Sequence, residues 1–304
     1  MRDTGSKETK SPPDEVASGS APSRPASNLR RWILIASAAL ILLLAFALVP
    51  IPGGDDWMTF SGAARRVLSG TPLYGSRVTD DYFSNPPWLA VLLVPLGVLP
   101  FRWGWSVLTV TSLVLVALLA RRYKAGGFKL ALVLLSPPMI YMLLHGQIDA
   151  LVLGFALLPS YMWPLGALTK PQVFAGMIFG LRGRQWLYAI GVTVLVVALS
   201  LLAFGNWPQQ LLKQPMPFLS AAHNLWFGLW PFQVPVGVGL AILGIERREE
   251  RYLLAASPFF LPYAATSSLL GPWLAVCTGL KGWQSSIVLL VWWGAVALRA
   301  IGWA

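Results

Sequence analysis

Ionisable and amide side chains occur in short clusters between the long apolar runs of this chain. The residues of these clusters that could do chemistry are Asp55, Asp56, Asn85, His145, Gln147, Asp149, Lys170 and Gln172. Carboxylate, imidazole and ammonium groups move protons and neutralise charge, whereas amides orient a ligand through hydrogen bonds. An ionisable group beside lipid is costly, so each of these residues is by default a candidate functional residue.

The apolar runs that separate these clusters indicate a membrane protein. Of the 304 residues, 56% are hydrophobic and 12% are charged, whereas a soluble domain has about 25% charged residues. Apolar stretches of roughly the 20 residues that cross hydrocarbon recur from Trp32 to the C-terminus. The sequence therefore predicts an all-α, polytopic transmembrane bundle of about 9 to 11 spans, some of them short or re-entrant. It excludes a soluble enzyme.

The distribution of basic residues explains the formal charge of +11. Lys and Arg occur in short groups between apolar runs, as is typical of cytoplasmic loops, so nucleic acid is not an expected partner. The single cysteine, Cys277, cannot form an internal disulfide or a cysteine-based metal site.

The first hundred residues predict a tail, a span and an outer loop. Residues 1–31 are rich in Ser, Pro and charge, which predicts a disordered cytoplasmic tail, and residues 32–304 form the transmembrane domain. The first span is Trp32–Val49, which places the N-terminus in the cytoplasm of a plasma-membrane protein. In the following outer loop, apolar residues from Trp57 to Leu68 recur at helical spacing, which predicts a helix in the plane of the interface.

The rest of the chain predicts further spans, one of them ambiguous. Ile148–Thr169 is interrupted by Pro159 and Pro164 and forms either a hairpin of half-helices or a single crossing. The hairpin is favoured because it keeps Asp149 and Lys170 outside and the later basic loops inside. The other expected membrane segments are 88–99 (partly re-entrant), 103–120, 130–144, 173–181, 187–204, 225–245, 252–267, 269–280 and 287–300.

This topology places most of the polar clusters on the outer face, together with Arg102, His223 and Asn224. Several of these residues have a structural alternative. Asp55 or Asp56 is equally suited to capping the interfacial helix, and His145 to binding a backbone carbonyl. Arg65 and Arg66 favour contact with lipid headgroups over contact with a substrate.

Four motifs, in order, resemble one membrane enzyme family. They are Gly54-Asp55-Asp56-Trp57 leading to Arg65-Arg66-Val67-Leu68-Ser69-Gly70-Thr71-Pro72-Leu73-Tyr74, then Asn85-Pro86-Pro87-Trp88 with Pro95-Leu96-Gly97, then Gly146-Gln147-Ile148-Asp149, and then Lys170-Pro171-Gln172. This set is similar to that of the polyprenyl-phosphate-mannose-dependent alpha-mannosyltransferases of the GT-C superfold. The likeness covers residues 32–186 well and the remainder loosely.

The resemblance implies an inverting hexosyltransferase that works at the outer membrane surface. Its donor is a polyprenyl-phosphate-linked sugar, and its acceptor is a lipid or a glycan. Asp55 or Asp56 then acts as the general base, and Lys170, supported by Arg102 and His223, stabilises the departing phosphate. The remaining polar residues, Gln147, Asp149, Asn85, Asn224, Gln172 and His145, bind substrate. No metal and no cofactor are expected.

Two other classes of function remain open at this stage. A transporter or lipid flippase also uses broken helices and intramembrane ionisable groups, but it predicts charges at the midplane of the bilayer. The predicted spans are nearly free of charge, which favours surface chemistry. A catalytically inactive relative of the family, acting as a scaffold, is the other alternative.

Overall fold

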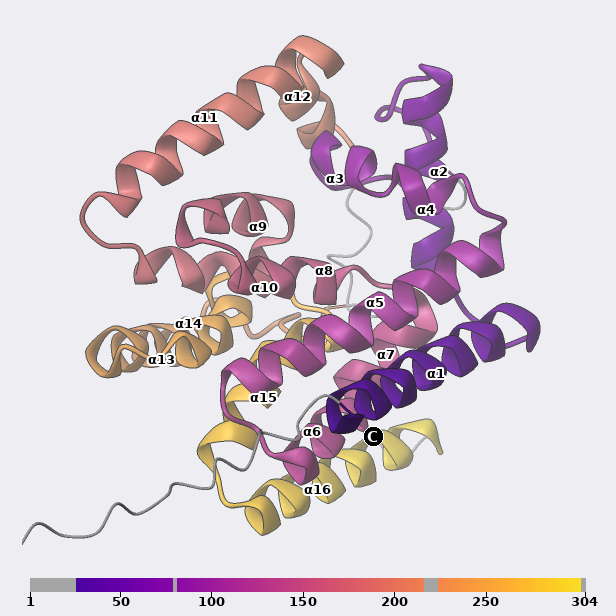
Figure 1. Cartoon of the computed structure of the whole chain (residues 1–304). Helices are drawn as coiled ribbons and strands as arrows, with labels where there is room; N and C mark the ends of the chain where they lie inside the picture. The colour runs from indigo at the N-terminus through magenta and orange to yellow at the C-terminus, as the bar shows by residue number, and fades with distance from the viewer. Residues whose placement is uncertain (1–25, 79–80, 216–223, 302–304) are drawn as a thin grey trace, which may run out of the picture. The chain divides into compact units, whose positions relative to one another are not determined.

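The computed structural model describes residues 26–78, 81–215 and 224–301, and every regular element in those ranges is a helix (Figure 1). The chain forms two compact units, Met1–Leu40 and Ile41–Ala304, and the candidate site lies wholly within the second. The predicted tail up to residue 25 lies outside the described residues, as does His223. Helix α1 begins at Ala26, ahead of the predicted start at Trp32.

Pro and Gly divide most of the apolar sequence into short helices. The α-helices are α1 (Ala26–Leu48), α2 (Asp55–Ser69), α3 (Pro87–Leu92), α4 (Val94–Gly97), α5 (Phe101–Arg122), α6 (Gly127–Leu134), α7 (Pro137–His145), α8 (Asp149–Gly154), α9 (Trp163–Thr169), α10 (Pro171–Phe174), α11 (Gln185–Phe204), α12 (Trp207–Leu212), α13 (Val234–Arg247), α14 (Glu250–Ala256), α15 (Leu270–Gly279) and α16 (Gly282–Ala300). The 3₁₀-helices are η1 (Phe155–Leu157), η2 (Ser160–Met162), η3 (Ala175–Gly180), η5 (Ser257–Phe260) and η6 (Thr266–Leu269).

Fewer helices are long enough to cross a membrane than the sequence predicts. Among the described residues, α5 and α11 are long and apolar enough, and α6 with α7 makes a third candidate if this pair, bent by 52°, is one span. The predicted 9 to 11 spans are not confirmed, and the helices explain why. Proline has no amide hydrogen and clashes with the preceding turn, so helices end before it or begin at it. Helix α13, for example, starts at Val234, well after the predicted Leu225, and carries Pro235 in its first turn.

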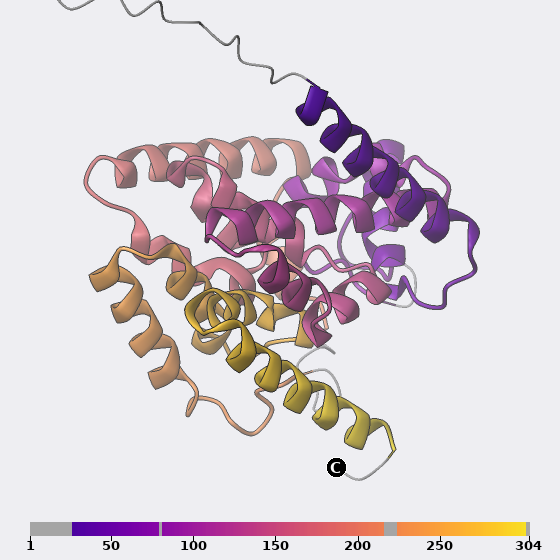
Figure 2. The same ribbon diagram turned by 60° about the horizontal axis from the view of Figure 1, so that its bottom comes forward.

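Helix α11 shows most clearly which surfaces suit lipid. It lies at the edge of the second unit in both views (Figures 1 and 2). Large apolar side chains along it, such as Leu187, Val194 and Leu202, are exposed. An exposed apolar surface of this length is stable in hydrocarbon and not in water, so α11 supports membrane association.

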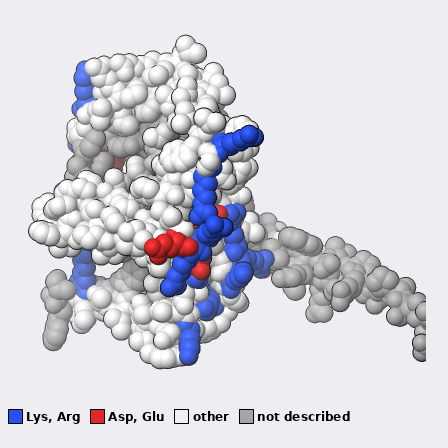
Figure 3. Space-filling view, turned by 90° about the vertical axis from the view of Figure 1, so that its left-hand side faces the viewer, with Lys and Arg blue, Asp and Glu red and all other residues white. Residues whose placement is uncertain are grey.

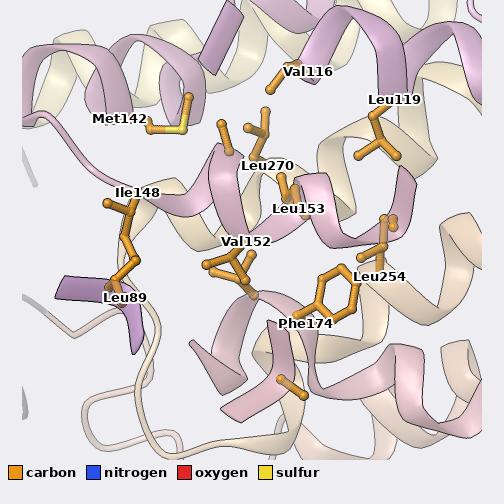
Figure 4. Packing of buried hydrophobic residues seen from close by; sticks show 14 of the residues in the cluster. Leu89, Val116, Leu119, Met142, Ile148, Val152, Leu153, Phe174, Leu254 and Leu270 are labelled. Atoms are coloured by element: carbon orange, nitrogen blue, oxygen red, sulfur yellow. The ribbon is translucent and has the colours of Figure 1, made fainter. Parts of the chain in front are cut away.

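The core of the second unit forms where α5 packs on α8. Val116 and Leu119 of α5 lie beside Val152 and Leu153 of α8, and Phe174 of α10 closes the cluster from the other side (Figure 4). These side chains are essentially inaccessible. The apolar core therefore fixes α8, at whose first residue Asp149 lies, and α10, which follows Lys170 directly.

Candidate active site

The N-terminus of α2 is held against the end of α7 by Trp57. The Trp57 ring is fully buried, and its Nε1 donates a hydrogen bond to the Phe101 carbonyl at 3.0 Å. A Cβ on Gly104 would lie 2.6 Å from Trp57 Cζ2, and one on Gly146 would lie 2.5 Å from Trp57 Cβ. The two glycines thus allow an approach that no other residue permits. This packing brings Asp55 and Asp56 to the segment that carries His145 and Gln147.

Gly146 also turns the chain so that the next residues face the site. It ends α7 in the left-handed conformation, with φ 69, and the Gln147 amide donates to the Met142 carbonyl at 2.9 Å. Such a turn satisfies the last carbonyls of a helix and suits glycine best. Because the turn is tight, His145, Gln147 and Asp149 lie close together although they belong to different elements.

Lys170 lies at the break between α9 and α10, and residues of the Asn-Pro-Pro-Trp motif fix this break. Asn85 Nδ2 donates to the Thr169 carbonyl at 2.9 Å, and Trp88 Nε1 donates to Thr169 Oγ1 at 2.8 Å. The Asn85 carbonyl in turn accepts a hydrogen bond from the Tyr74 hydroxyl at 2.7 Å. Asn85 therefore positions the backbone beside Lys170. The sequence predicted only that Asn85 binds substrate.

A continuous chain of polar contacts links the two halves of the site. Gln147 Nε2 donates to Asp56 Oδ2 at 2.5 Å, and Lys170 Nζ donates to Gln147 Oε1 at 2.6 Å. The ammonium of Lys170 also lies 2.7 Å from Asp149 Oδ1. Three motifs that are far apart in the sequence thus converge on one network, and Gln147 is the bridge between the carboxylate and the ammonium group.

The Lys170–Asp149 pair is buried. The Lys170 side chain is 9% exposed, and that of Asp149 is inaccessible. The approach of the ammonium is close but lies outside hydrogen-bond geometry, so both Asp149 oxygens lack a hydrogen bond within the described part of the chain. The ion pair therefore compensates the Asp149 charge chiefly through Coulomb attraction. The pair shows that the segment between Asp149 and Lys170 returns to its starting point; on which side of a membrane it does so stays a prediction.

The network opens into a cavity of about 510 Å³. Five of the predicted residues line it, namely Asp56, Asn85, Gln147, Lys170 and Gln172. A cavity of this volume is large enough for a small-molecule ligand, since such pockets span roughly 300–1,000 Å³. Asp56 and Lys170 therefore face a common volume in which a ligand can meet both a carboxylate and a cation.

Burial raises the pKa of Asp56 from 3.8 to about 6. Loss of solvent around the carboxylate is the main cause, because it disfavours the charged form. Lys170 and His145 lower the pKa, whereas Asp55 and Asp149 raise it, so the effects of these four charged neighbours partly cancel. A carboxylate with a pKa near neutrality is suited to taking up a proton during a reaction.

Asp55 has a different environment from its neighbour. Its side chain is 65% exposed, and it is not among the residues that line the cavity. His145 Nδ1 lies 2.8 Å from Asp55 Oδ1, and because a carboxylate accepts, that nitrogen carries the hydrogen. The contact replaces the backbone carbonyl that the sequence offered as an alternative partner. It orients the imidazole against Asp55 and leaves Asp56 as the carboxylate that faces the cavity.

Asp55, Asp56 and His145 are also arranged so that they can hold a metal ion. One ligand atom of each lies within 4.8 Å of the others. Two carboxylates and an imidazole suit divalent ions such as Mn²⁺ or Zn²⁺. In the structure these groups also have protein partners, namely Gln147 for Asp56 and each other for Asp55 and His145. Removing divalent ions and adding them back therefore tests the prediction that no metal is needed.

The other predicted residues that the structure describes do not line the cavity. Arg102 is exposed and does not line it. The Asn224 side chain binds the Pro262 carbonyl and the Ala264 amide, so it supports the loop on which cavity-lining Pro262 lies. Arg65 binds the carbonyls of Gly97 and Leu99, where the sequence favoured lipid headgroups. Arg66 likewise binds the Pro72 carbonyl.

Sequence reasoning did not assign several residues that line the cavity, and three of them show why. Tyr82, Thr169 and Tyr263 line the cavity, and none of them carries a charge that would have singled it out. Thr169 directly precedes Lys170, so it could have been predicted from the same motif. Tyr263 lies in the loop after η5, about 90 residues further along the chain, and no local pattern links it to Lys170.

No protein-family model, curated protein or solved structure is similar enough to this chain to count as a match. The geometry of the cavity and the sequence motifs that build it therefore carry the functional argument.

Proposed function

We propose that this chain is a membrane glycosyltransferase of the GT-C type. It transfers a hexose, with mannose as the first candidate, from a polyprenyl-phosphate donor to a hydroxyl of a lipid or glycan acceptor. The observation that carries the proposal is the joint presence of Asp56 and Lys170 on one cavity of about 510 Å³, joined through Gln147. A base and a cation that face one ligand volume are what transfer from a sugar phosphate needs.

Asp56 is the general base in this proposal. As the acceptor oxygen bonds to the anomeric carbon, its proton passes to Asp56, and the bond between that carbon and the phosphate oxygen breaks. The polyprenyl phosphate leaves with the bonding electrons. A positioned base contributes roughly 10²–10⁴-fold to such a step. Displacement in a single step inverts the anomeric configuration.

Lys170 stabilises the departing phosphate. Its ammonium has three hydrogens, and its contacts with Gln147 and Asp149 hold it in place before a ligand arrives. A preorganised cation is effective because no reorganisation is needed when charge develops. Asp149 offsets part of this charge, so Gln172 and Asn85, which also line the cavity, complete the binding of the phosphate and the sugar hydroxyls.

The length of α5 supports a location at a membrane surface. At its start, Phe101 binds Trp57 beside the site, and at its end, Arg122 binds Glu250. A helix of 22 residues is about 33 Å long, which matches hydrocarbon of about 30 Å. This length supports a site at one membrane surface with the Arg122 pair at the other. The site then faces outward and the N-terminus lies in the cytoplasm of a multi-pass plasma-membrane protein, as the basic loops require.

A transporter or flippase is the second candidate, and the buried Lys170–Asp149 pair favours it. Ionisable pairs inside membrane proteins mark substrate and ion pathways. This candidate predicts that the lipid donor crosses the bilayer unchanged. The glycosyltransferase proposal predicts that the donor is consumed.

The test uses liposomes that contain the purified full-length chain and radiolabelled polyprenyl-phosphate-hexoses, with extracted membrane lipids and glycans as acceptors. The wild type should consume one donor and release polyprenyl phosphate. Asp56→Asn should lower turnover by roughly 10²–10⁴-fold, and Lys170→Ala should also lower it. Asp55→Asn is the matched control, because it removes the neighbouring carboxylate that does not line the cavity.

Three outcomes contradict the proposal. If the donor is not consumed with any acceptor, and all variants behave like the wild type, the chain is an inactive relative. Donor that crosses the bilayer intact identifies a transporter. Loss of turnover in EDTA that Mn²⁺ or Mg²⁺ restores shows that the Asp55, Asp56 and His145 cluster works as a metal site, and the base assigned to Asp56 is then wrong.

A further inference from the structure

A second cavity lies away from the candidate site, and most of the charged side chains that line it are basic. It has a volume of about 580 Å³, and Arg122, Arg182 and Arg248 line it together with Glu250. We call it the arginine cavity. It shares no lining residue with the site cavity. Arg122 is the last residue of α5, whereas the start of α5 supports the site.

Two of the three guanidinium groups form no ion pair with a carboxylate among residues 26–78, 81–215 and 224–301. Arg122 forms a two-point contact with Glu250, at 3.1 Å and 2.9 Å. Arg182 makes one long contact with the Ile245 carbonyl, at 3.4 Å. The Arg248 side chain has no ion pair in the part of the chain that the structure describes. Guanidinium groups bind phosphate oxygens in pairs. The arginine cavity therefore has cationic donors available for an anion.

A buried donor points to the same kind of ligand. Trp163 also lines the arginine cavity and is only 4% exposed. Its Nε1 has no acceptor in the described part of the chain. A buried N–H group without an acceptor is costly, and most such groups in folded proteins are paired. An oxygen-rich ligand in the cavity would supply the missing acceptor.

The wall of the cavity favours a ligand that also has an apolar part. Leu158 and Ile245 line it, and both side chains are more than two-fifths exposed. Figure 3 shows the face on which α13 and α14 lie, where Lys and Arg side chains gather in a band beside a smaller group of acidic ones and a broad uncharged surface. A basic pocket between apolar surfaces is typical of sites for anionic lipid headgroups.

We propose that the arginine cavity binds the phosphate of an anionic phospholipid. Arg182 and Arg248 contact the phosphate oxygens, Trp163 Nε1 donates to the headgroup, and the acyl chains lie against Leu158 and Ile245. The shared chemistry, an anionic phosphate, also describes free phosphate, and the experiment separates the two sources. The proposal does not depend on the function of the site cavity.

The backbone at Arg248 allows a clean variant. Arg248 has φ 55, a left-handed conformation that glycine adopts without strain. Arg248→Gly therefore removes the guanidinium and should not lower the melting temperature. Combined with Arg182→Gln, it removes both uncompensated charges. Arg184→Gln is the matched control, because it removes a charge two residues from Arg182 at a position that does not line the cavity.

The test is a titration of the full-length chain in a neutral detergent, followed by native mass spectrometry. Phosphatidylglycerol should bind more tightly than phosphatidylcholine with the same acyl chains. The double variant should weaken phosphatidylglycerol binding by about tenfold or more, as the loss of charge-assisted hydrogen bonds predicts. Trp163→Phe should weaken it by a smaller factor, and Arg184→Gln should leave it unchanged.

Each contrary result overturns the proposal. Equal weakening by Arg184→Gln and by the double variant shows unspecific attraction to a basic surface. Phosphatidylglycerol binding that the double variant does not change excludes the arginine cavity as the site. Inorganic phosphate at millimolar concentration, if it binds on its own and displaces the lipid, shows that the cavity takes a soluble anion and not a headgroup.

Discussion

The site cavity and the arginine cavity show two ways in which this protein uses charge. At the site, Lys170 and Asp149 are buried and held within a network of short contacts. At the arginine cavity, Arg122 and Glu250 are paired but 39% and 28% exposed, and Arg182 and Arg248 have no carboxylate partner among the described residues. Buried charges need compensation, whereas exposed ones are stabilised by water. The first arrangement favours catalysis, because it fixes geometry, and the second favours reversible binding.

Breaking the buried pair should have the largest effect on stability. Lys170→Met leaves the Asp149 carboxylate buried and uncompensated, which costs about 3–5 kcal/mol. The double variant Lys170→Met with Asp149→Leu replaces both charges by apolar groups of similar size and should recover most of that stability, although it should have no activity. Denaturant unfolding of the full-length chain in detergent measures both values. A double variant as unstable as the single one contradicts the buried-pair interpretation.

The raised pKa of Asp56 predicts that pH changes the stability of the fold nearly as much as breaking the buried pair does. Since the pKa rises from 3.8 unfolded to about 6 folded, the folded state binds more protons between these values. Stability therefore falls as pH rises from about 4 to 6, by up to roughly 3 kcal/mol at about 1.4 kcal/mol per pKa unit. Turnover should change in the opposite direction and rise through pH 6, as the base loses its proton.

Asp56→Asn is the control for this prediction. It should remove the fall in stability between pH 4 and pH 6 and abolish the rise in turnover. Unfolding curves and kcat/KM profiles at several pH values test both. If the asparagine variant retains the wild-type pH profile of stability, another group is responsible.

Alanine at a glycine beside the site should give the next largest loss of stability, and the glycine that ends α2 supplies a matched control. Gly146 and Gly70 have almost the same φ, 69 and 68, so alanine at either position costs about 1–2 kcal/mol of backbone strain. Only at Gly146 would the new Cβ clash, 2.5 Å from Trp57 Cβ; at Gly70 it meets nothing within 4 Å. Gly146→Ala should therefore be clearly less stable than Gly70→Ala and should also lower turnover, because Trp57 positions Asp56. Equal melting temperatures would show that Trp57 has room to shift.

Much of the site was predictable from sequence because each motif carries its own local signal. Asp56, Gln147 and Lys170 were singled out by residue type and position at the ends of apolar runs, and they meet in the structure. The contact between Gln147 and Lys170 was not predictable, since it depends on how the hairpin from Asp149 to Lys170 closes. Asp55 and Asp56 were indistinguishable in sequence. Burial separates them, and burial is a property of the fold.

The helices show where hydropathy alone fails. Apolar runs predicted the positions of α5 and α11 well, because neither contains proline. The run from Leu225 to Ile245 was read as one span, but only its second part, from Val234, is helical. Hydropathy measures the preference for lipid and contains no information on backbone geometry, so it does not show where Pro and Gly divide an apolar run into short helices.

Breaking the exposed ion pair at the arginine cavity should lower the free energy of unfolding least, in contrast to breaking the Lys170–Asp149 pair. Arg122 and Glu250 make a well-aligned two-point contact, but water reaches both side chains. Arg122→Gln should therefore cost less than about 1 kcal/mol, and 0.5 M NaCl should reduce that cost further by screening. The stability lost on breaking the Lys170–Asp149 pair should hardly change with salt, because solvent ions do not reach it. The same denaturant titration at low and high salt measures both pairs. A cost above 2 kcal/mol for Arg122→Gln, independent of salt, would mean that the arginine cavity is as preorganised as the site.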